Sequence, residues 1–397
     1  MQSVERERYT QLWEENLRYI TQVRRSLHAQ PELGTKEEKT HDFLARELER
    51  LGVDELHTYY GTGLRAVIRA KAPMRTLAFR ADMDALPLSE QTGRDFASQT
   101  PGVMHACGHD GHMAALLGLA QLIQALGRPQ DANVVLLFQP DEEGEGGAAR
   151  MIAQGALKDP DVDEVYGFHL MPDLQEGLVA VSQGPMMALT NEFDIQIAGA
   201  SAHGATPHMG SDALTAAAYL ITQMQTIVSR RVDPGQMAAL TIGRMEAGQV
   251  RNALAAQAHL EGIMRAYDER THDKMRATIR EMLAGLEKSF DVKTAYIQKC
   301  YYPPVINPAP NARKIREAAG KRAVEATPKL TAEDFSFYQQ AVPGAYFFLG
   351  TRSGEKGFLA PLHAPRFDFD EAVLQVAQAI YLCLLGYTQA ATCLLEP

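Results

Sequence analysis

Nine consecutive residues, Met104–His112, bring together one thiol, three imidazoles and one carboxylate. The apolar run Met113–Leu126 follows with helical periodicity, so we expect the polar stretch to be a loop that leads into a helix N-terminus. The helix dipole there favours the anionic form of Cys107, which is the form that binds a metal. The alternative interpretation is a polar loop that contains a buried, unreactive cysteine.

Further side chains of the ligand type follow predicted strands. They are Asp82 and Asp84 after the strand 76–80, Glu142 and Glu143 after the apolar strand 134–138, and His169 at the end of the strand 165–170. Active sites of open α/β sheets lie at the carboxyl ends of the strands, so this repeated placement predicts one site at that edge. Asp82 and Asp84 are two positions apart, which on a strand would put both carboxylates on one face.

The hydrophobic pattern changes near residue 186. The elements predicted from there are a strand at 193–197, a helix at 214–228, strands at 238–242 and 259–264, a helix at 272–286 and a strand at 292–297. This βαββαβ order is that of the split ferredoxin-like unit. We therefore expect an α/β protein with an inserted ferredoxin-like α+β domain, residues 186–298. It would interrupt a catalytic domain formed by 1–185 and 299–397, whose mostly parallel sheet is flanked by helices.

Composition narrows the class of protein. The 397 residues are 46% hydrophobic, which is enough to build two domains, and carry a formal net charge of −10. Acidic and basic residues are interspersed, so a nucleic acid is not an expected partner. Four scattered cysteines argue against a disulfide framework, the first residues lack an apolar signal segment, and the longest apolar run, 377–385, is too short to span a bilayer. We expect a cytoplasmic protein without a membrane partner.

These motifs together resemble the M20 family of metallohydrolases, specifically its branch of aminoacylases, hippurate hydrolases and indoleacetyl-amino-acid hydrolases. The resemblance covers nearly the whole chain, and the segments that carry it are Leu27–Gly34, Arg80–Pro87, Met104–His109, Gln139–Gly144, Gly167–His169, Ser201–His208, Glu333–Phe335 and His363.

The resemblance implies a centre of two divalent ions bound by five side chains: Cys107, His109, Glu143, His169 and His363. It implies that Cys107 bridges the ions, that Glu142 is the general acid/base, and that Asp84 supports the ligands. Imidazole, thiolate and carboxylate donors together suit zinc, manganese, cobalt or nickel.

The resemblance also implies functions for residues of the inserted domain. A histidine there stabilises the oxyanion, often across a dimer interface, and the matching residue is His203. Asn252 and Arg265 match positions that hold the substrate's carboxylate or backbone; as residues alone, they also fit a loop asparagine and a surface arginine. The chain departs from the family pattern at Asn252–Ala255, where Asn-x-Ile-Pro is common, and at Asp141, where alanine or glycine is common. We expect a homodimer or a higher homo-oligomer.

The resemblance implies a metal-dependent amidohydrolase that cleaves the amide bond of small N-acyl amino acids, and the chemistry of these residues fits amide hydrolysis independently. Two metal ions can supply a hydroxide at neutral pH, and Glu142 can take a proton from the water and pass it to the leaving amine. A dipeptidase or carboxypeptidase on the same scaffold is the nearest alternative. A non-catalytic binding protein would not need Glu142, and a thiol redox protein would need a second cysteine near Cys107.

Overall fold

The computed structural model describes residues 3–395. By its internal contacts the chain divides into two compact units. Unit 1 comprises Met1–Met186, Ile306–Thr327 and Asp334–Pro397, and unit 2 comprises Met187–Val305 and Pro328–Glu333. Each unit has its own sheet, helices and hydrophobic core.

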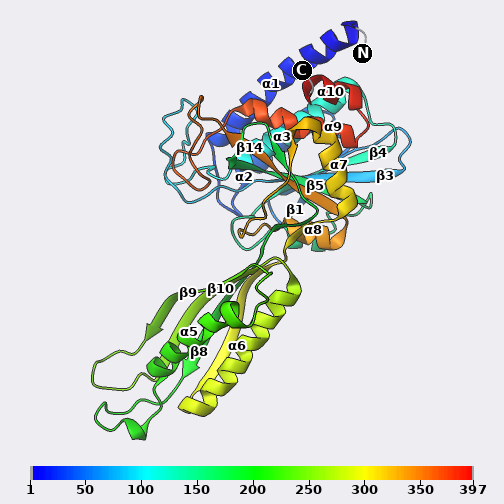
Figure 1. Ribbon diagram of the computed structural model, residues 1–397. Helices are drawn as coiled ribbons and strands as arrows, with labels where there is room; N and C mark the ends of the chain where they lie inside the picture. Colours follow the sequence, from blue (N-terminus) through cyan, green and yellow to red (C-terminus); the bar gives the residue numbers. More distant parts are fainter. Residues whose placement is uncertain (1–2, 396–397) are drawn as a thin grey trace. The chain divides into compact units, whose positions relative to one another are not determined.

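An eight-stranded sheet forms the centre of unit 1, in the order β1-β2-β4-β3-β5-β14-β6-β13 (Figure 1). Its strands are β1 (Glu55–Tyr59), β2 (Gly63–Ile68), β3 (Arg75–Asp82), β4 (Ala132–Gln139), β5 (Glu164–Gln175), β6 (Val179–Ala180), β13 (Ala323–Val324) and β14 (Gly344–Arg352). Two short strands, β7 (Gly184–Met187) and β12 (Val305–Asn307), pair separately.

The sheet is mixed rather than mostly parallel. Its four central strands, β4, β3, β5 and β14, run parallel, whereas β1 and β2 form an antiparallel hairpin and β6 pairs antiparallel with β14. The expectation of a mostly parallel sheet therefore holds for the four central strands and for the short β6–β13 pair, whereas β1, β2 and the β6–β14 pairing depart from it. Three residues between β1 and β2 are too few for the crossover that a parallel pair needs.

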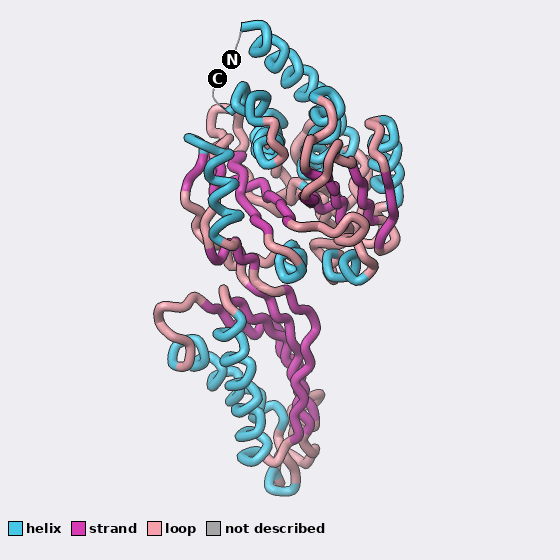
Figure 2. Tube along the Cα trace, turned by 90° about the vertical axis from the view of Figure 1, so that its right-hand side faces the viewer, coloured by secondary structure: helices cyan, strands magenta, loops and turns pink. Residues whose placement is uncertain are grey.

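Helices cover both faces of this sheet (Figures 1 and 2). The helices of unit 1 are α1 (Ser3–His28), α2 (Glu38–Arg50), α3 (His109–Leu126), α4 (Ala148–Ala153), α7 (Ala309–Ala319), α8 (Phe335–Ala341), α9 (Leu374–Leu384) and α10 (Thr388–Leu395). Helices α1, α2, α3, α7 and α9 share one core cluster with the strands, which includes Phe347 of β14. The preceding residue of β14, Tyr346, points to the opposite face of the sheet and packs against Phe335 of α8.

Helix α3 is the central helix of unit 1 and is buried around most of its circumference. It packs between α1, α9 and the sheet. At Gly118 the three helices approach so closely that an added Cβ would lie under 3.0 Å from the side chains of Gln378 and Ile20. This packing fixes the N-terminus of α3 at the carboxyl ends of the central strands.

Unit 2 is a four-stranded antiparallel sheet in the order β11-β8-β10-β9 with two helices. Its elements follow the chain as β8 (Leu189–Ala198), α5 (Ala213–Arg230), β9 (Ala238–Ala247), β10 (Gln257–Ala266), α6 (Glu269–Phe290) and β11 (Lys293–Tyr302). Alternating residues such as Ile195 and Leu260 pack against α5 and α6. Helix α6 begins earlier than the expected residue 272 because the Asp268 side chain accepts a hydrogen bond from the Thr271 N–H at 2.8 Å and caps it.

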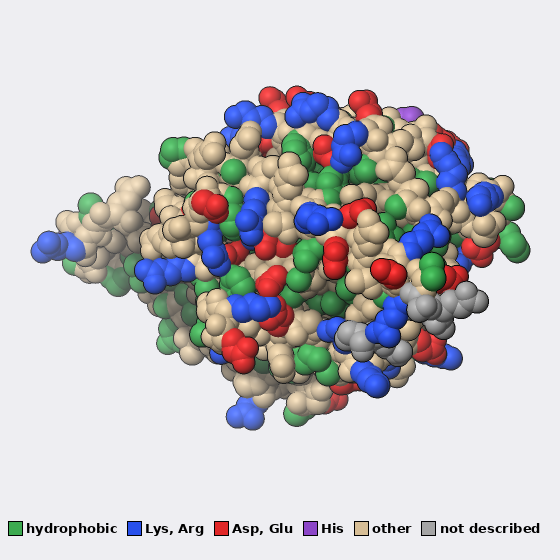
Figure 3. Space-filling view, turned by 90° about the horizontal axis from the view of Figure 1, so that it is seen from above, with side chains coloured by type: hydrophobic (Ala, Val, Ile, Leu, Met, Phe, Trp, Pro, Cys, Tyr) green, Lys and Arg blue, Asp and Glu red, His purple; other side chains and the backbone are tan. Residues whose placement is uncertain are grey.

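In residues 3–395 we find no helix with the length and apolarity needed to cross a membrane. Figure 3 shows one face of the molecule, on which Lys and Arg side chains are interspersed with Asp and Glu.

Candidate metal centre

The carboxyl ends of the central strands carry several of the predicted site residues. Strand β3 ends at Asp82, directly opposite Gln139 at the end of β4. Glu142 and Glu143 follow Gln139 in the next turn. His169 lies in β5, opposite Phe348 of β14. The parallel centre of the sheet therefore brings residues that are distant in sequence to one edge.

The polar segment ahead of α3 is shorter than expected. Helix α3 begins at His109, so His109 and His112 lie in its first turn rather than in a preceding loop. Gly108, with φ 91°, makes the turn into the helix, and its carbonyl accepts a hydrogen bond from the His112 N–H at 3.1 Å. Cys107 lies just outside the helix and is buried.

Two histidines are oriented by backbone carbonyls. Nδ1 of His109 donates to the Asp84 carbonyl at 2.8 Å, and Nδ1 of His169 donates to the Leu170 carbonyl at 2.7 Å. A carbonyl can only accept, so each neutral ring keeps a lone pair on Nε2. Nε2 of His109 is buried without a hydrogen-bond partner, and Nε2 of His169 lies 3.3 Å from Cys107 Sγ. Both rings thus present a nitrogen that can bind a metal.

The remaining candidates converge on the same place. His363 Nε2 lies 3.1 Å from Glu143 Oε1, and the His363 N–H donates to the carbonyl of Ala106 at 2.8 Å, next to Cys107. Among the described residues, five sets of ligand-type side chains have atoms within 4.8 Å of one another, and three of these sets contain the predicted ligands: Cys107, His109 and His169; Cys107, Glu143 and His363; and His109, Glu142 and Glu143. Because Cys107 and His109 each belong to two of these three sets, the five predicted ligands and Glu142 form one cluster.

Burial and nearby carboxylates perturb the ionisable groups of this cluster. Burial, followed by the charges of Glu143 and Glu142, raises the pKa of the Cys107 thiol well above its usual range. Burial also lowers the pKa of His169 to about 3. Burial acts to lower the pKa of His109, but the carboxylates of Asp82 and Asp84 outweigh it and raise that pKa to about 10. A cation within the cluster would compensate the carboxylates and favour the thiolate.

The donors present fit divalent metal ions. An unpartnered buried nitrogen such as Nε2 of His109 costs on the order of 1–3 kcal/mol unless another group binds it. The cluster offers ring nitrogens, one sulfur and carboxylate oxygens, the donor types that suit zinc and neighbouring transition metals.

Strand β3 ends at Asp82, so the alternation of a strand does not extend to Asp84. Both carboxylates nevertheless lie against the His109 ring, with Asp82 Oδ2 3.7 Å from Nε2 and Asp84 Oδ1 3.4 Å from Nδ1. The Asp82 carboxylate accepts hydrogen bonds from Arg80 Nη1 at 2.7 Å and from His112 Nδ1 at 2.6 Å. Asp84 Oδ2 instead accepts the N–H of Glu143 at 2.9 Å. Asp82 is thus bound to other side chains of the core, whereas Asp84 holds the backbone of a candidate ligand.

A buried network of side chains that was not predicted from the sequence lies behind the cluster. Arg80 donates to Gln139 at 2.9 Å and to Asp334 at 2.8 Å, in addition to Asp82. The N–H of Leu170 donates to His112 Nε2 at 3.2 Å, which links the network to β5 beside His169. Polar residues within apolar strands, such as Arg80 and Gln139, are the sequence signal that could have indicated it.

The three predicted substrate residues of unit 2 do not all lie together. His203 forms a β-bridge with Ala253, and the Gly204 N–H donates to the Asn252 carbonyl at 2.8 Å, so the His203 and Asn252 loops are paired beside the start of β10. Arg265 lies near the other end of β10, opposite Thr190. With 3.3 Å per residue, the start of β10 and Arg265 are ~26 Å apart. Burial lowers the pKa of Arg265, and its Nη1 is buried without a hydrogen-bond partner.

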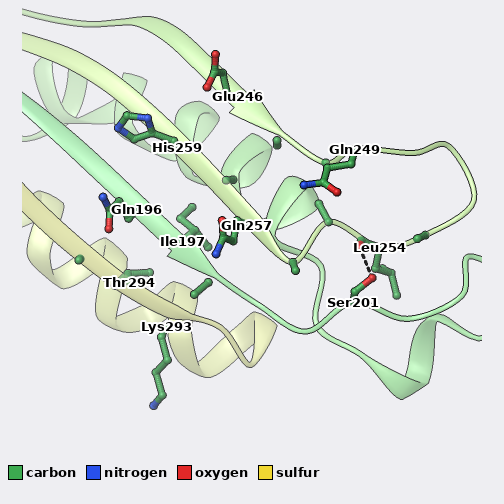
Figure 4. Close-up of a pocket in the computed structure, with 18 of the residues that line it drawn as sticks. Gln196, Ile197, Ser201, Glu246, Gln249, Leu254, Gln257, His259, Lys293 and Thr294 are labelled. Atoms are coloured by element: carbon green, nitrogen blue, oxygen red, sulfur yellow. Dashed lines mark hydrogen bonds between the residues drawn. The ribbon is translucent and has the colours of Figure 1, made fainter.

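Unit 2 also contains an open hollow of about 860 Å³ (Figure 4). Gln196, Gln257, His259 and Thr294 line it from neighbouring strands, and Ser201 donates to the Leu254 carbonyl at its rim. None of the ligand sets described above includes a residue of this hollow. The candidate metal ligands therefore lie in the unit 1 cluster and not in this hollow.

Comparisons with known proteins agree with this picture. Residues 78–386 match the model of peptidase family M20/M25/M40. The N-acetyldiaminopimelate deacetylase of Streptococcus gordonii is 39% identical over 364 residues, 89% of this chain and 94% of the relative. The N-acetyl-L-cysteine deacetylase of Bacillus subtilis is 36% identical over 363 residues, 90% and 86% of the two chains. The solved YXEP protein of Bacillus subtilis, described as a dinuclear metal binding peptidase from the M20 family, is 30% identical, covers 96% of this chain and 99% of its own, and has a TM-score of 0.81.

Proposed function

Because this chain belongs to peptidase family M20/M25/M40, we propose that it is a metal-dependent amidohydrolase that releases small acyl groups from N-acyl amino acids. Its curated relatives are named as deacetylases of N-acetyldiaminopimelate and N-acetyl-L-cysteine. These names favour deacylation over the dipeptidase and carboxypeptidase alternatives. The observation that carries the proposal is the cluster of nitrogen, sulfur and carboxylate donors beside Glu142, buried or half-buried except for the exposed His363.

We assign two divalent ions to the five-residue cluster. The ligands would be Cys107, His109, Glu143, His169 and His363. Cys107 belongs to the set with His109 and His169 and to the set with Glu143 and His363, which supports the proposal that its sulfur would serve both ions. When bound, the ions would lower the pKa of a water molecule. That water could then lose a proton near neutral pH and attack an amide carbonyl.

Glu142 is the proposed general acid/base. It lies within 4.8 Å of the ligand atoms of His109 and Glu143, close enough to take a proton from a water held there. The same carboxyl group then donates that proton to the nitrogen of the leaving amino acid. Asp84 keeps the neighbouring Glu143 in place through the Glu143 N–H.

Unit 2 supplies the proposed substrate contacts. His203 would donate to the oxyanion, Asn252 would bind the substrate backbone, and Arg265, with its unpartnered Nη1, would bind the substrate carboxylate. These residues lie at opposite ends of β10, too far apart to touch one small molecule from the same copy of unit 2. We therefore propose a homodimer in which His203 and Asn252 act on the partner's substrate, with unit 2 as a ferredoxin-like lid and dimerisation domain.

A substrate screen tests the proposed function. Purified protein would be assayed on N-acetyl and N-benzoyl amino acids and, in parallel, on dipeptides, before and after chelation and re-addition of zinc, manganese, cobalt or nickel. We expect deacylation that the chelator abolishes and one of these metals restores. Faster turnover of dipeptides would favour the peptidase alternative, and chelator-resistant turnover would contradict the metal-dependent mechanism.

A further inference from the structure

The residue just before Glu142 has an unusual backbone conformation. Asp141 has φ 59°, in the left-handed region that side chains other than glycine rarely adopt, although Asp and Asn tolerate it best. Its side chain is buried, with 5% of its surface exposed. The strained backbone of Asp141 therefore sets the direction of the peptide that leads to Glu142.

The Asp141 side chain fills a space between two loops. A Cβ added at Gly34 or at Gly144 would lie under 3.0 Å from Asp141 Oδ1, closer than real Cβ atoms come. A side chain at either position would therefore require the Asp141 carboxylate to move from its place. The carboxylate also accepts a hydrogen bond from the N–H of Glu145, and Tyr60 Oη lies 3.5 Å from its Oδ2. Asp141 thus closes the turn that contains Glu142 and Glu143.

Glu37, at the start of α2, holds the same residue from behind. It is fully buried. Its Oε1 accepts a hydrogen bond from the Asp141 N–H at 3.1 Å, and its Oε2 accepts one from the Thr62 hydroxyl at 2.8 Å. The Asp141 carbonyl accepts the Gly146 N–H at 3.1 Å. Both backbone polar groups of Asp141 are therefore fixed, and the Glu142 peptide has little freedom to rotate.

The segment that contains Gly34 and Glu37 also holds the Asp84 segment. The Ala85 N–H donates to the Glu32 carbonyl at 2.8 Å, next to Asp84. Asp84 in turn accepts the Glu143 N–H. Residues 32–37 thus fix both segments that hold Glu143, although no residue of 32–37 belongs to the ligand cluster.

A turn that served only to stabilise the fold would not need two buried carboxyl groups near a third, Asp84. We propose that Asp141 and Glu37 are positioning residues that hold the Glu142–Glu143 backbone in the orientation needed for proton transfer. The kinetic consequence rests on the proposed function, whereas the structural consequence does not.

Three substitutions test this proposal. D141G keeps a residue that accepts a positive φ but removes the carboxylate, D141N keeps the shape and removes the charge, and E37Q keeps an acceptor for the Asp141 N–H. The exposed neighbour Glu38 offers a matched control, E38Q. Each variant would be measured for kcat, KM, metal content, thermal midpoint and, without metal, for hydrogen exchange of the peptide that contains residues 141–147.

We expect D141G to lose on the order of tenfold to a hundredfold in kcat, with KM and metal content within about twofold of the parent, because small displacements of a catalytic group have effects of this size. D141N should retain more activity than D141G because its amide oxygen can occupy the same space. The kcat of E37Q should lie between the kcat values of E38Q and D141G. Amides of 141–147 should exchange at least about tenfold faster in metal-free D141G, since fewer bonds hold the turn.

Unchanged kcat and unchanged exchange in both D141G and E37Q would overturn the proposal. So would a loss of metal that parallels the loss of kcat, or failure of both variants to fold, because the residues would then serve metal binding or global stability. If the parent protein has no activity on N-acyl amino acids, the proposed function fails, while the exchange measurement still decides the positioning role.

Discussion

Asp84 Oδ2 accepts a hydrogen bond from the backbone N–H of Glu143 at 2.9 Å, and the backbone carbonyl of Asp84 accepts one from Nδ1 of His109 at 2.8 Å. One residue thus orients two proposed ligands that come from different elements. We expect D84A to lower metal affinity on the order of tenfold to a hundredfold, as loss of a residue that orients ligands commonly does. D84N should lose less because its amide oxygen can still accept the Glu143 N–H. Competition titration with a chromogenic chelator measures the metal affinities of the two variants. Equal affinities for D84A and the parent would contradict this role.

Glu142 lies beside the ligand cluster without being one of the five proposed ligands. E142Q removes the proton shuttle but keeps a side chain of similar size, so metal content should stay unchanged. The expected loss in kcat is roughly a hundredfold to ten-thousandfold, the usual range for a general acid/base. Elemental analysis and steady-state kinetics on the same sample check both parts. E142Q with parental turnover would remove Glu142 from the mechanism.

Cys107 is buried against His169, and the other three cysteines, Cys300, Cys383 and Cys393, are partly exposed. If its sulfur binds metal, an alkylating reagent should label Cys107 more slowly in metal-loaded than in metal-free protein. Labelling of the other three should be the same in both states, which provides an internal control. Mass spectrometry of digested peptides gives the rates. Equal labelling of Cys107 in the two states would exclude it as a ligand.

His28, the last residue of α1, contacts Asp110 Oδ2 at 2.8 Å and Glu90 Oε1 at 3.2 Å. Burial acts to lower the pKa of His28, but Asp110 and the hydrogen bonds to Asp110 and Glu90 raise it to about 9. The pKa of His28 in the folded protein exceeds its unfolded value of 6.5. The stabilisation that the charged His28 gives the folded protein is therefore complete below pH 6.5 and is lost as the pH rises through 9.

The stability advantage of the parent over H28N should therefore fall by up to about 3 kcal/mol between pH 6 and pH 10. Urea unfolding of metal-free protein at both pH values measures it. The same substitution at the exposed His57, H57N, serves as the control. A difference between parent and H28N that does not vary with pH would contradict a charged His28 in the folded protein.

The proposed dimer predicts complementation between two inactive variants. E142Q removes the proton shuttle in unit 1 and H203A removes the oxyanion donor in unit 2. If His203 acts on the partner's substrate, each mixed dimer has one intact site, and random exchange of subunits should restore about a quarter of the parental activity. If His203 acts within its own chain, mixtures stay inactive. Activity after unfolding and refolding the two variants together distinguishes the outcomes.

The sequence predicted local structure well where the pattern repeats over several turns or residues. The apolar run after Met113 gave α3, and the apolar strand 134–138 gave β4. Boundaries that depend on single side chains were less accurate: α6 begins earlier because Asp268 caps it, and α3 begins at His109 because Gly108 turns the chain. The antiparallel pairs of the unit 1 sheet were not predicted because pairing direction leaves little trace in one strand's composition.

The sequence by itself determined the kinds of donor atoms, their place at the ends of buried strands, and, through resemblance, the family. Only the tertiary structure decided which atoms meet: that Asp82 binds Arg80 and His112 whereas Asp84 holds Glu143, and that Asp141 and Glu37 fix the turn before Glu142. The physical reason is that hydrophobic periodicity is a local property of the chain. Contacts between residues a hundred positions apart depend on how the strands and helices pack, which no local pattern records.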